Sequence, residues 1–390
     1  MSMPGYLEAL RMLCQDAGGD VHRVLDAACG LAPVADPVVY LADFSHTRLL
    51  PLESGRPAEE IGGTLAGLAF TTVRPVAGAP DETGQRVWVP VLEQTTCTGV
   101  LAVTVPEATE EALSEAELLG VFAGLVTAMT VRVSDIPGLW RRERPMSLPA
   151  SMQWDLLPPL TARTSGAVIA GILEPAYDIA GDAFDYAVNG RDLHFAVLDG
   201  MGHGIGSTLL TGLAVGAYRH ARRAGESLTG THAAIDQALA GYYEDLSFAT
   251  GILARLDASS GRLEWSCAGH PPPLLLRGRK VVAELTSDVG LPFGLGGDSP
   301  ETASMDLEPG DAVLCYTDGV TEARTPDGEM FGLERLTDLA EREAASGRPA
   351  EDLIRRLVRA VMEHQASDLR DDATLLLVQW TAAPGLSGIA

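Results

Sequence analysis

The pattern of apolar and polar residues divides the chain into two parts, each with α/β character. In the first part, three short valine-rich runs predict strands, at residues 38–41, 86–91 and 99–103. Apolar residues at helical spacing predict one helix around Tyr6 to Cys29 and a closing helix from about Ser114 to Val133. We therefore expect a separate α/β domain over residues 1–133.

The pattern breaks between residues 134 and 158. Two prolines and the basic cluster Arg141 to Arg144 interrupt the apolar periodicity. Apolar residues at helical spacing then predict a short helix packed on the sheet that follows. These residues are Met152, Leu156 and Leu157. We expect a linker and helix at 134–158 and a second domain at 159–381, since 390 residues are enough for two domains.

Four aspartates stand at the ends of apolar runs in the second part: Asp182, Asp199, Asp318 and Asp371. A strand holds its terminal side chain rigidly. Four such acids gathered at sheet ends would therefore form the oxygen-only site that Mg²⁺ or Mn²⁺ prefers. Asp-Gly is also a common turn dipeptide after a strand, so any one of these acids could lie in a solvated turn. The combination favours a two-metal hydrolase.

A helix is predicted after the second acid, from about Ile205 to Arg222. Its position after Gly204 would place its N-terminus near a bound phosphate. Its inward-facing residues are expected to be Leu209, Leu210, Leu213 and Val215.

Seven motifs accompany the acids in a fixed order. They are Gln153 to Pro158, Pro175 to Tyr186, Asp199 to Gly204, Phe248 to Thr250, Ala268 to Leu274, Pro292 to Gly294 and Tyr316 to Val320. With them, residues from about 150 to 381 resemble the SpoIIE/RsbU-type branch of the metal-dependent serine/threonine phosphatases, the PPM superfamily. The resemblance implies an α-β-β-α sandwich of two packed sheets flanked by helices, with the metals at one end.

The resemblance also implies the metal ligands. Asp182 matches the acid that binds one ion. Asp199 matches the acid that bridges two ions of Mn²⁺ or Mg²⁺, with the Gly200 carbonyl as a further ligand. Asp318 and Asp371 match the two later acidic ligands.

Three assignments stay open. Asp372 is an alternative to Asp371, because adjacent residues of an extended segment face opposite sides; we favour Asp371. Asp185 could hold a metal-bound water or shape its loop. His203 and His270 could protonate the departing serine oxygen, or they could hydrogen-bond their own loops.

The first part resembles a GAF sensory domain, in the runs Leu65 to Phe70, Val87 to Val91 and Gly99 to Leu101. This resemblance implies either a pocket for a small molecule or a dimerisation module whose pocket is filled by side chains. Cys97 is expected in a loop between strands, as a free thiol.

The phosphatase resemblance implies hydrolysis of phosphoserine or phosphothreonine on a protein. The implied substrate is a phosphorylated anti-sigma-factor antagonist in a partner-switching pathway, and the linker helix would join dimer contacts to the metal site. Two alternatives remain, a catalytically silent scaffold and a hydrolase of a small phosphorylated metabolite. The intact set of four acids disfavours the first. The lack of an evident base-binding or sugar-binding motif disfavours the second.

The closing helix of the first part has more apolar residues than a small domain needs, which predicts a homodimer. These residues are Leu118, Leu119, Phe122, Leu125 and Met129.

Composition narrows the choice of partners and compartment. The chain has 28 basic and 53 acidic residues and a net charge of −25, which disfavours nucleic acid and anionic membranes as partners. Its five cysteines lack paired spacing, as in a reducing compartment. We find neither an N-terminal signal pattern nor an uninterrupted apolar run near the ~18 residues of a membrane span. A cytoplasmic protein is expected.

Overall fold

The computed structural model describes residues 34–382, except 54, 132, 179–180, 243–246 and 367–370. The chain divides into two compact units, Met1–Pro145 and Met146–Ala390, and each is described by itself. The helix predicted around Tyr6 to Cys29 lies outside the described residues.

The first unit is built on a six-stranded antiparallel sheet in the order β3-β2-β1-β6-β5-β4. The three predicted strands are confirmed and lie within β1, β5 and β6. Cys97 lies inside β6 and is buried, so its predicted loop position was wrong. The strands are β1 (Ala35–Ala42), β2 (Arg48–Pro51), β3 (Glu59–Glu60), β4 (Val76–Asp81), β5 (Gly84–Glu93) and β6 (Thr96–Val105).

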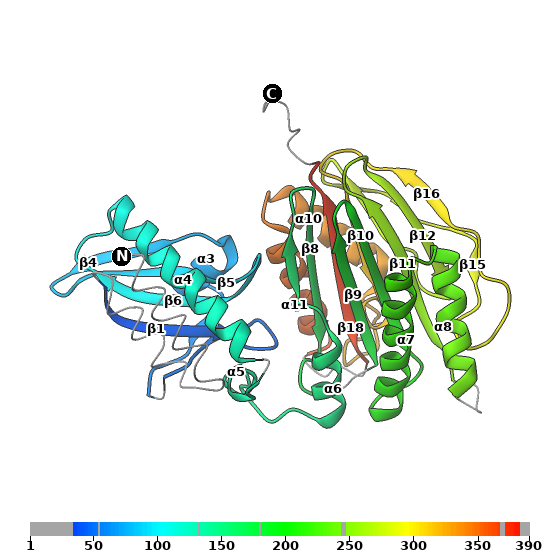
Figure 1. Ribbon diagram of the computed structural model, residues 1–390, viewed down its shortest axis with the longest axis horizontal. Helices are drawn as coiled ribbons and strands as arrows, with labels where there is room; N and C mark the ends of the chain where they lie inside the picture. The colour runs from blue at the N-terminus through cyan, green and yellow to red at the C-terminus, as the bar shows by residue number, and fades with distance from the viewer. Residues whose placement is uncertain are drawn as a thin grey trace. The chain divides into compact units, whose positions relative to one another are not determined.

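Successive side chains of β1 point to opposite faces of the sheet, and a helix covers each face. Val38 and Tyr40 belong to the core beneath α3 (Leu65–Thr72), whereas Val39 and Leu41 belong to the core beneath α4 (Glu110–Thr130). Figure 1 shows α4 lying along one face of the sheet. A short helix, α5 (Ile136–Trp140), follows α4 in the chain.

Helix α4 begins four residues before its predicted start, because the Thr109 hydroxyl accepts a hydrogen bond from the Ala112 N–H and caps the helix. Of its predicted apolar face, Leu119 and Phe122 are buried in the core of the first unit. Its exposed face contains large apolar residues at helical spacing. These are Leu118, Val121, Leu125 and Met129.

Within the described residues, α4 is also the one helix that is long and apolar enough to cross a membrane. The criterion concerns length and composition, and a buried core helix of a soluble domain satisfies it as well. Glu115 and Glu117 interrupt its apolar run, so the run length in the sequence does not reveal it.

The second unit contains two six-stranded sheets. The first has the order β15-β12-β11-β10-β9, with β16 also paired to β12, and the second has the order β14-β13-β17-β18-β8-β7. The first comprises β9 (Asp182–Asn189), β10 (Asp192–Gly200), β11 (Ala249–Asp257), β12 (Arg262–Ala268), β15 (Val289–Gly290) and β16 (Ala303–Asp306). The second comprises β7 (Thr161–Arg163), β8 (Ala167–Glu174), β13 (Leu274–Arg277), β14 (Lys280–Glu284), β17 (Ala312–Tyr316) and β18 (Ala373–Trp380).

The two sheets pack face to face, and helices cover their outer faces. Phe184 and Val197 of the first sheet share one buried core with Leu376 and Val378 of the second. Helices α7 (Ile205–Ala224) and α8 (Leu228–Tyr242) cover the first sheet, and α10 (Gly332–Ala345) and α11 (Ala350–His364) cover the second. Figure 1 shows these layers, with α7 and α8 in green and α10 and α11 in orange to red. The predicted α-β-β-α sandwich is the fold of this unit.

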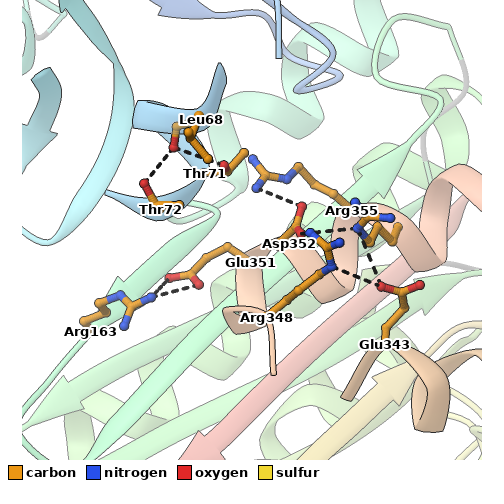
Figure 2. A network of polar contacts seen from close by, with 10 residues as sticks. Leu68, Thr71, Thr72, Arg163, Glu343, Arg348, Glu351, Asp352 and Arg355 are labelled. Carbon is orange, nitrogen blue, oxygen red and sulfur yellow. Dashed lines mark hydrogen bonds and ion pairs between the residues drawn. The ribbon is translucent and has the colours of Figure 1, made fainter. Parts of the chain in front are cut away.

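Ion pairs connect the helices on the outside of the second sheet. Arg348 contacts Glu343 of α10 at 4.0 Å and Asp352 of α11 at 3.2 Å, and Arg163 of β7 contacts Glu351 at 2.7 Å (Figure 2). Solvent-exposed pairs of this kind contribute at most about 1 kcal/mol each. The buried apolar faces of α10 and α11 therefore hold this layer in place.

Two predicted helix faces differ from the observed ones. In α6 (Leu148–Leu156) the buried residues are Ala150 and Gln153, and the predicted apolar stripe is only half-buried. In α7, Leu210 and Val215 are buried as expected, but Leu209 is 51% exposed.

Candidate metal centre

The ends of two strands in each sheet bring the predicted acids to one place. Asp182 begins β9 and is the register partner of Asp199 near the end of β10. Asp318 follows β17 as the first residue of the short helix α9 (Asp318–Thr321). Asp371 and Asp372 precede β18, the neighbour of β17. All four predicted ligands therefore lie at corresponding ends of neighbouring strands.

Hydrogen bonds join the acidic ends of the two sheets. The Thr317 hydroxyl donates to Asp182 Oδ2 at 2.7 Å, and the Asp182 N–H donates to Asp372 Oδ2 at 3.1 Å. Helix α9 also approaches the segment before β18 closely here, since a Cβ on Gly319 would lie 1.9 Å from the Asp372 carbonyl oxygen. Glycine is required at this position for the acids to converge.

The acids repel one another. Burial, followed by the charges of Asp318, Asp371 and Asp372, raises the pKa of Asp199 to about 7. Burial and the charges of Asp199 and Asp372 raise the pKa of Asp182 well above its usual range. A divalent cation placed among these carboxylates would remove this repulsion.

Asp371 and Asp372 differ in their surroundings. Asp371 is exposed as a residue, and its Oδ1 accepts a hydrogen bond from the Asp372 N–H at 3.0 Å. Partial burial of its carboxyl, and then the charge of Asp318, raise its pKa. Asp372 is only 3% exposed, and burial is the main cause that raises its pKa to about 7. Its Oδ1 is buried without a hydrogen-bond partner in the described part of the chain. Both aspartates therefore remain candidate ligands.

Hydroxyl groups on the inner face of α7 hold the loops that contain the acids. Ser207 Oγ donates to the Gly200 carbonyl at 2.7 Å, and Thr211 Oγ1 donates to the Gly181 carbonyl. A carbonyl oxygen has two lone pairs, so Gly200 could still face an ion. Neither hydroxyl could be predicted from the sequence, because serine and threonine within a helix give no signal of what they contact.

Gln153 connects α6 to the same centre. Its side chain is buried, and its Nε2 donates to the Asp182 carbonyl. The sequence analysis treated α6 by its apolar residues and did not single out this polar one.

Asp185 has a different role from the two considered in the sequence analysis. Arg219 donates to both of its carboxylate oxygens, at 3.0 and 3.1 Å, and Arg222 donates to Oδ2 at 2.9 Å. Arg219 also donates to the carbonyl of Leu156 at the end of α6. Asp185 therefore attaches α7 to β9, and its charge is compensated by arginine.

The two histidines have unlike environments. His203 is exposed, and its charge lowers the pKa of Asp371. His270 is buried, its Nδ1 lies 2.9 Å from Thr250 Oγ1, and burial lowers its pKa to about 4. A buried imidazole that is neutral at physiological pH is unsuited to protonate a departing group, so His270 is not the general acid considered above.

The donor set fits Mg²⁺ or Mn²⁺, because it offers carboxylate and carbonyl oxygens and includes neither a thiolate nor a coordinating histidine. No three acidic, histidine or cysteine side chains in the described residues are close enough together to hold one ion as they stand. Hydrogen bonds from Thr317 and from backbone N–H groups occupy one carboxylate oxygen each of Asp182, Asp372 and Asp371.

Residues 189–381 match the family model described as Stage II sporulation protein E (SpoIIE). Together with the sandwich fold and the cluster of acids, this match indicates a SpoIIE-like phosphatase domain in the second unit. The match covers just under half of the chain and agrees with the resemblance stated for this part of the sequence.

Curated relatives and a solved structure agree with this domain. Protein IcfG of Synechocystis is 28% identical over 227 residues, which are 50% of this chain and 33% of IcfG. Phosphoserine phosphatase RsbU of Bacillus subtilis is 23% identical over 237 residues, 60% of this chain and 69% of RsbU. The SiaA-PP2C domain of Pseudomonas aeruginosa is 23% identical, with a TM-score of 0.51 over 59% of this chain and 93% of that domain. The likeness to the SiaA-PP2C domain shows the fold alone. The chain spans only a third of the length of IcfG. The match to the SpoIIE model supports a serine/threonine phosphatase.

Proposed function

We propose that this chain is a metal-dependent phosphatase that hydrolyses phosphoserine or phosphothreonine on a protein. The observation that supports this most strongly is the convergence of five aspartates from both sheets within a SpoIIE-like domain. The proposed substrate is a phosphorylated anti-sigma-factor antagonist of a partner-switching pathway. It is suggested by the family and by the likeness to RsbU, a phosphoserine phosphatase by name.

Asp182, Asp199, Asp318 and Asp371, with the Gly200 carbonyl, would hold the two Mn²⁺ or Mg²⁺ ions of the proposed site. Such ions, when bound, activate a water molecule and neutralise charge on the phosphoryl oxygens. The Thr317 hydroxyl holds Asp182, and Ser207 orients the loop after Asp199.

His203 is the histidine that could give a proton to the departing serine oxygen. It is exposed beside Asp371, where a substrate can reach it. Buried His270 is not accessible to a substrate.

We further propose that the first unit is a GAF-like sensor and that the protein is a cytoplasmic homodimer. The six-stranded antiparallel sheet with helices on both faces supports the sensor. The exposed apolar residues of α4 support the dimer. Helix α6, which contacts the Asp182 carbonyl through Gln153, is the element through which a signal would reach the metals.

The test compares Mn²⁺-dependent phosphate release by the full chain from a phosphoserine-containing antagonist protein and from p-nitrophenyl phosphate. We expect release from the phosphoprotein and a loss of at least about 100-fold in Asp199→Asn. Asp192→Asn is the matched control, because Asp192 lies at the other end of β10 in an ion pair with Arg255. Release from the small ester alone would indicate a metabolite hydrolase, and release from neither would indicate a scaffold.

A further inference from the structure

The motif from Ala268 to Pro273 follows β12, and the proposed reaction gives it no role. Its backbone is tightly constrained. Gly269 has a φ of +62°, and a Cβ there would lie 2.7 Å from Cγ of Pro292. The Gly269 N–H donates to the Gly290 carbonyl at 3.0 Å, and the Cys267 thiol donates to the His270 carbonyl at 3.0 Å. These contacts fix the position of the His270 side chain.

His270 extends a row of side chains that begins with the acids. Asp182 is the register partner of Asp199, and Asp199 is the register partner of Thr250 on β11. Directly opposite residues of antiparallel strands project from the same face. Phe184, Val197 and Ile252, each two residues from a member of this row, belong to the core between the sheets. Asp182, Asp199 and Thr250 therefore face the second sheet.

The imidazole continues this row toward the second sheet. Its Nδ1 lies 2.9 Å from Thr250 Oγ1, and the ring is 5% exposed. Burial lowers the pKa of the ring to about 4, and the neighbouring Tyr316 carbonyl opposes that shift. Nε2 is buried without a hydrogen-bond partner within the described residues. Tyr316 directly precedes Thr317, whose hydroxyl holds Asp182. His270 thus lies between the strand beside Asp199 and the segment that leads to Asp318.

We propose that His270 is a positioning residue for the metal centre. Through its hydrogen bond to Thr250 on one sheet and its position beside the Tyr316 carbonyl of the other, it sets the spacing between the end of β10, which contains Asp199, and the end of β17, which leads to Asp318. The proposal rests on the metal-dependent function proposed above. It assigns His270 neither metal coordination nor proton transfer.

The contact between His270 and Thr250 predicts which substitutions weaken metal binding. Groups that orient metal ligands without touching the metal typically contribute 10- to 100-fold in affinity. We expect His270→Leu and Thr250→Val each to weaken Mn²⁺ binding about tenfold. Thr250→Ser, which keeps the hydroxyl, should bind within about twofold of the wild type. Because both residues act through one contact, the double variant should be about as weak as His270→Leu alone.

His232→Leu is the matched control. His232 is also buried in the second unit, its Nδ1 lies 3.5 Å from Ser266 Oγ, and its ring packs on Phe293 at 4.7 Å between centroids. Within the described residues, His232 makes no hydrogen bond or ring contact with Asp182, Asp199, Thr250 or His270. A general effect of losing a buried histidine should therefore appear in His232→Leu as well.

The experiment titrates EDTA-treated full-length protein with Mn²⁺ by calorimetry and measures the Tm with and without Mn²⁺. Tenfold weaker binding in His270→Leu and Thr250→Val, with His232→Leu unchanged, supports the proposal. A lower metal-free Tm with unchanged Mn²⁺ affinity overturns it and leaves His270 a packing residue. If His270→Leu does not fold, Thr250→Val decides between these outcomes. Failure of the wild type to bind Mn²⁺ would instead refute the proposed metal centre, and this inference with it.

Discussion

A buried carboxylate needs a compensating partner, and the aspartates of the second unit differ in whether they have one. Asp185 is paired with Arg219 and Arg222, so its charge is balanced within the protein. Asp182 and Asp372 instead receive hydrogen bonds from hydroxyl and amide groups and lie beside other carboxylates. The excess negative charge at one point is the residue-scale evidence for a cation site. It distinguishes these acids from the structural Asp185.

Substitution of the two neighbouring aspartates should separate their roles. In Asp372→Asn the amide oxygen can still accept the Asp182 N–H, so the backbone contact survives. Asp371 is exposed beside Asp318 and makes no such cross-sheet bond in the described structure. We expect Asp371→Asn to weaken Mn²⁺ binding at least about tenfold more than Asp372→Asn, measured by calorimetry. Equal losses in the two variants would contradict the preference for Asp371.

The raised pKa values predict how the stability of the metal-free protein depends on pH. A carboxyl whose pKa is near 7 when folded and near 4 when unfolded binds its proton more tightly in the folded state. The free energy of unfolding should therefore fall as pH rises from about 4 through about 7, by on the order of 1 to 3 kcal/mol. Urea unfolding in EDTA at several pH values between 5 and 8 measures this.

Asp199→Asn should reduce that fall, because it removes one of the repelling carboxylates. The metal-free variant should then be more stable than the wild type at pH 8, although it lacks turnover. A wild-type stability that rises between pH 5 and 8 would show that these acids do not dominate the pH dependence.

At the scale of elements, the sequence predicted the strands better than the contacts of the helices. Each acid stands at the end of an apolar run, and such runs are visible without knowing their partners. The buried face of α6 was mispredicted, because the helix directs Gln153 toward the Asp182 loop and leaves its apolar residues half-buried. Periodicity identifies an apolar stripe and cannot show that a polar residue is the one buried.

Contacts between residues that are far apart in the sequence could not be predicted either. Asp185 is 34 and 37 residues away from the arginines that bind it. Leu209 was expected to face inward, yet it is exposed on α7. The candidate metal ligands were proposed because a known family has them in fixed motifs, and their role as ligands stays a prediction. The hydroxyls of Ser207, Thr211 and Thr317 that orient them required the fold.

The contact of α6 with the Asp182 loop predicts that this helix controls the site. Gln153→Leu removes the donor to the Asp182 carbonyl while leaving the helix able to form. We expect turnover of the phosphoprotein to fall about tenfold with little change in helix content by circular dichroism. Asp155→Asn, on the exposed side of the same helix, is the control and should retain activity. Full activity in Gln153→Leu would mean that α6 is not coupled to the metals through this side chain.

At the scale of the whole molecule, the exposed face of α4 is the feature that one chain leaves unexplained. Leu118 is 53% exposed and Leu125 is 44% exposed, on a helix whose other side is packed on the sheet. Val121 and Met129 lie on the same exposed face, so the apolar residues continue along about three helical turns. A second copy of α4 presents the same face, and pairing across a two-fold axis would bury both at once.

In a two-fold interface both subunits contain each substitution, so one charged substitution at the centre buries two like charges and should strongly weaken the dimer. We expect the wild type to sediment as a dimer at micromolar concentration, and Leu125→Glu to raise the dimer dissociation constant at least about 100-fold. Leu65→Glu is the matched control, because Leu65 is similarly exposed, at 41%, on α3 of the same unit. If dimerisation regulates catalysis, the Mn²⁺-dependent rate of Leu125→Glu should differ from that of the wild type by about 5- to 150-fold, the usual range of allosteric coupling. A monomeric wild type, or a Leu125→Glu variant that dimerises like the control, would refute the α4 interface. A monomeric variant with an unchanged rate would keep the interface and remove its regulatory role.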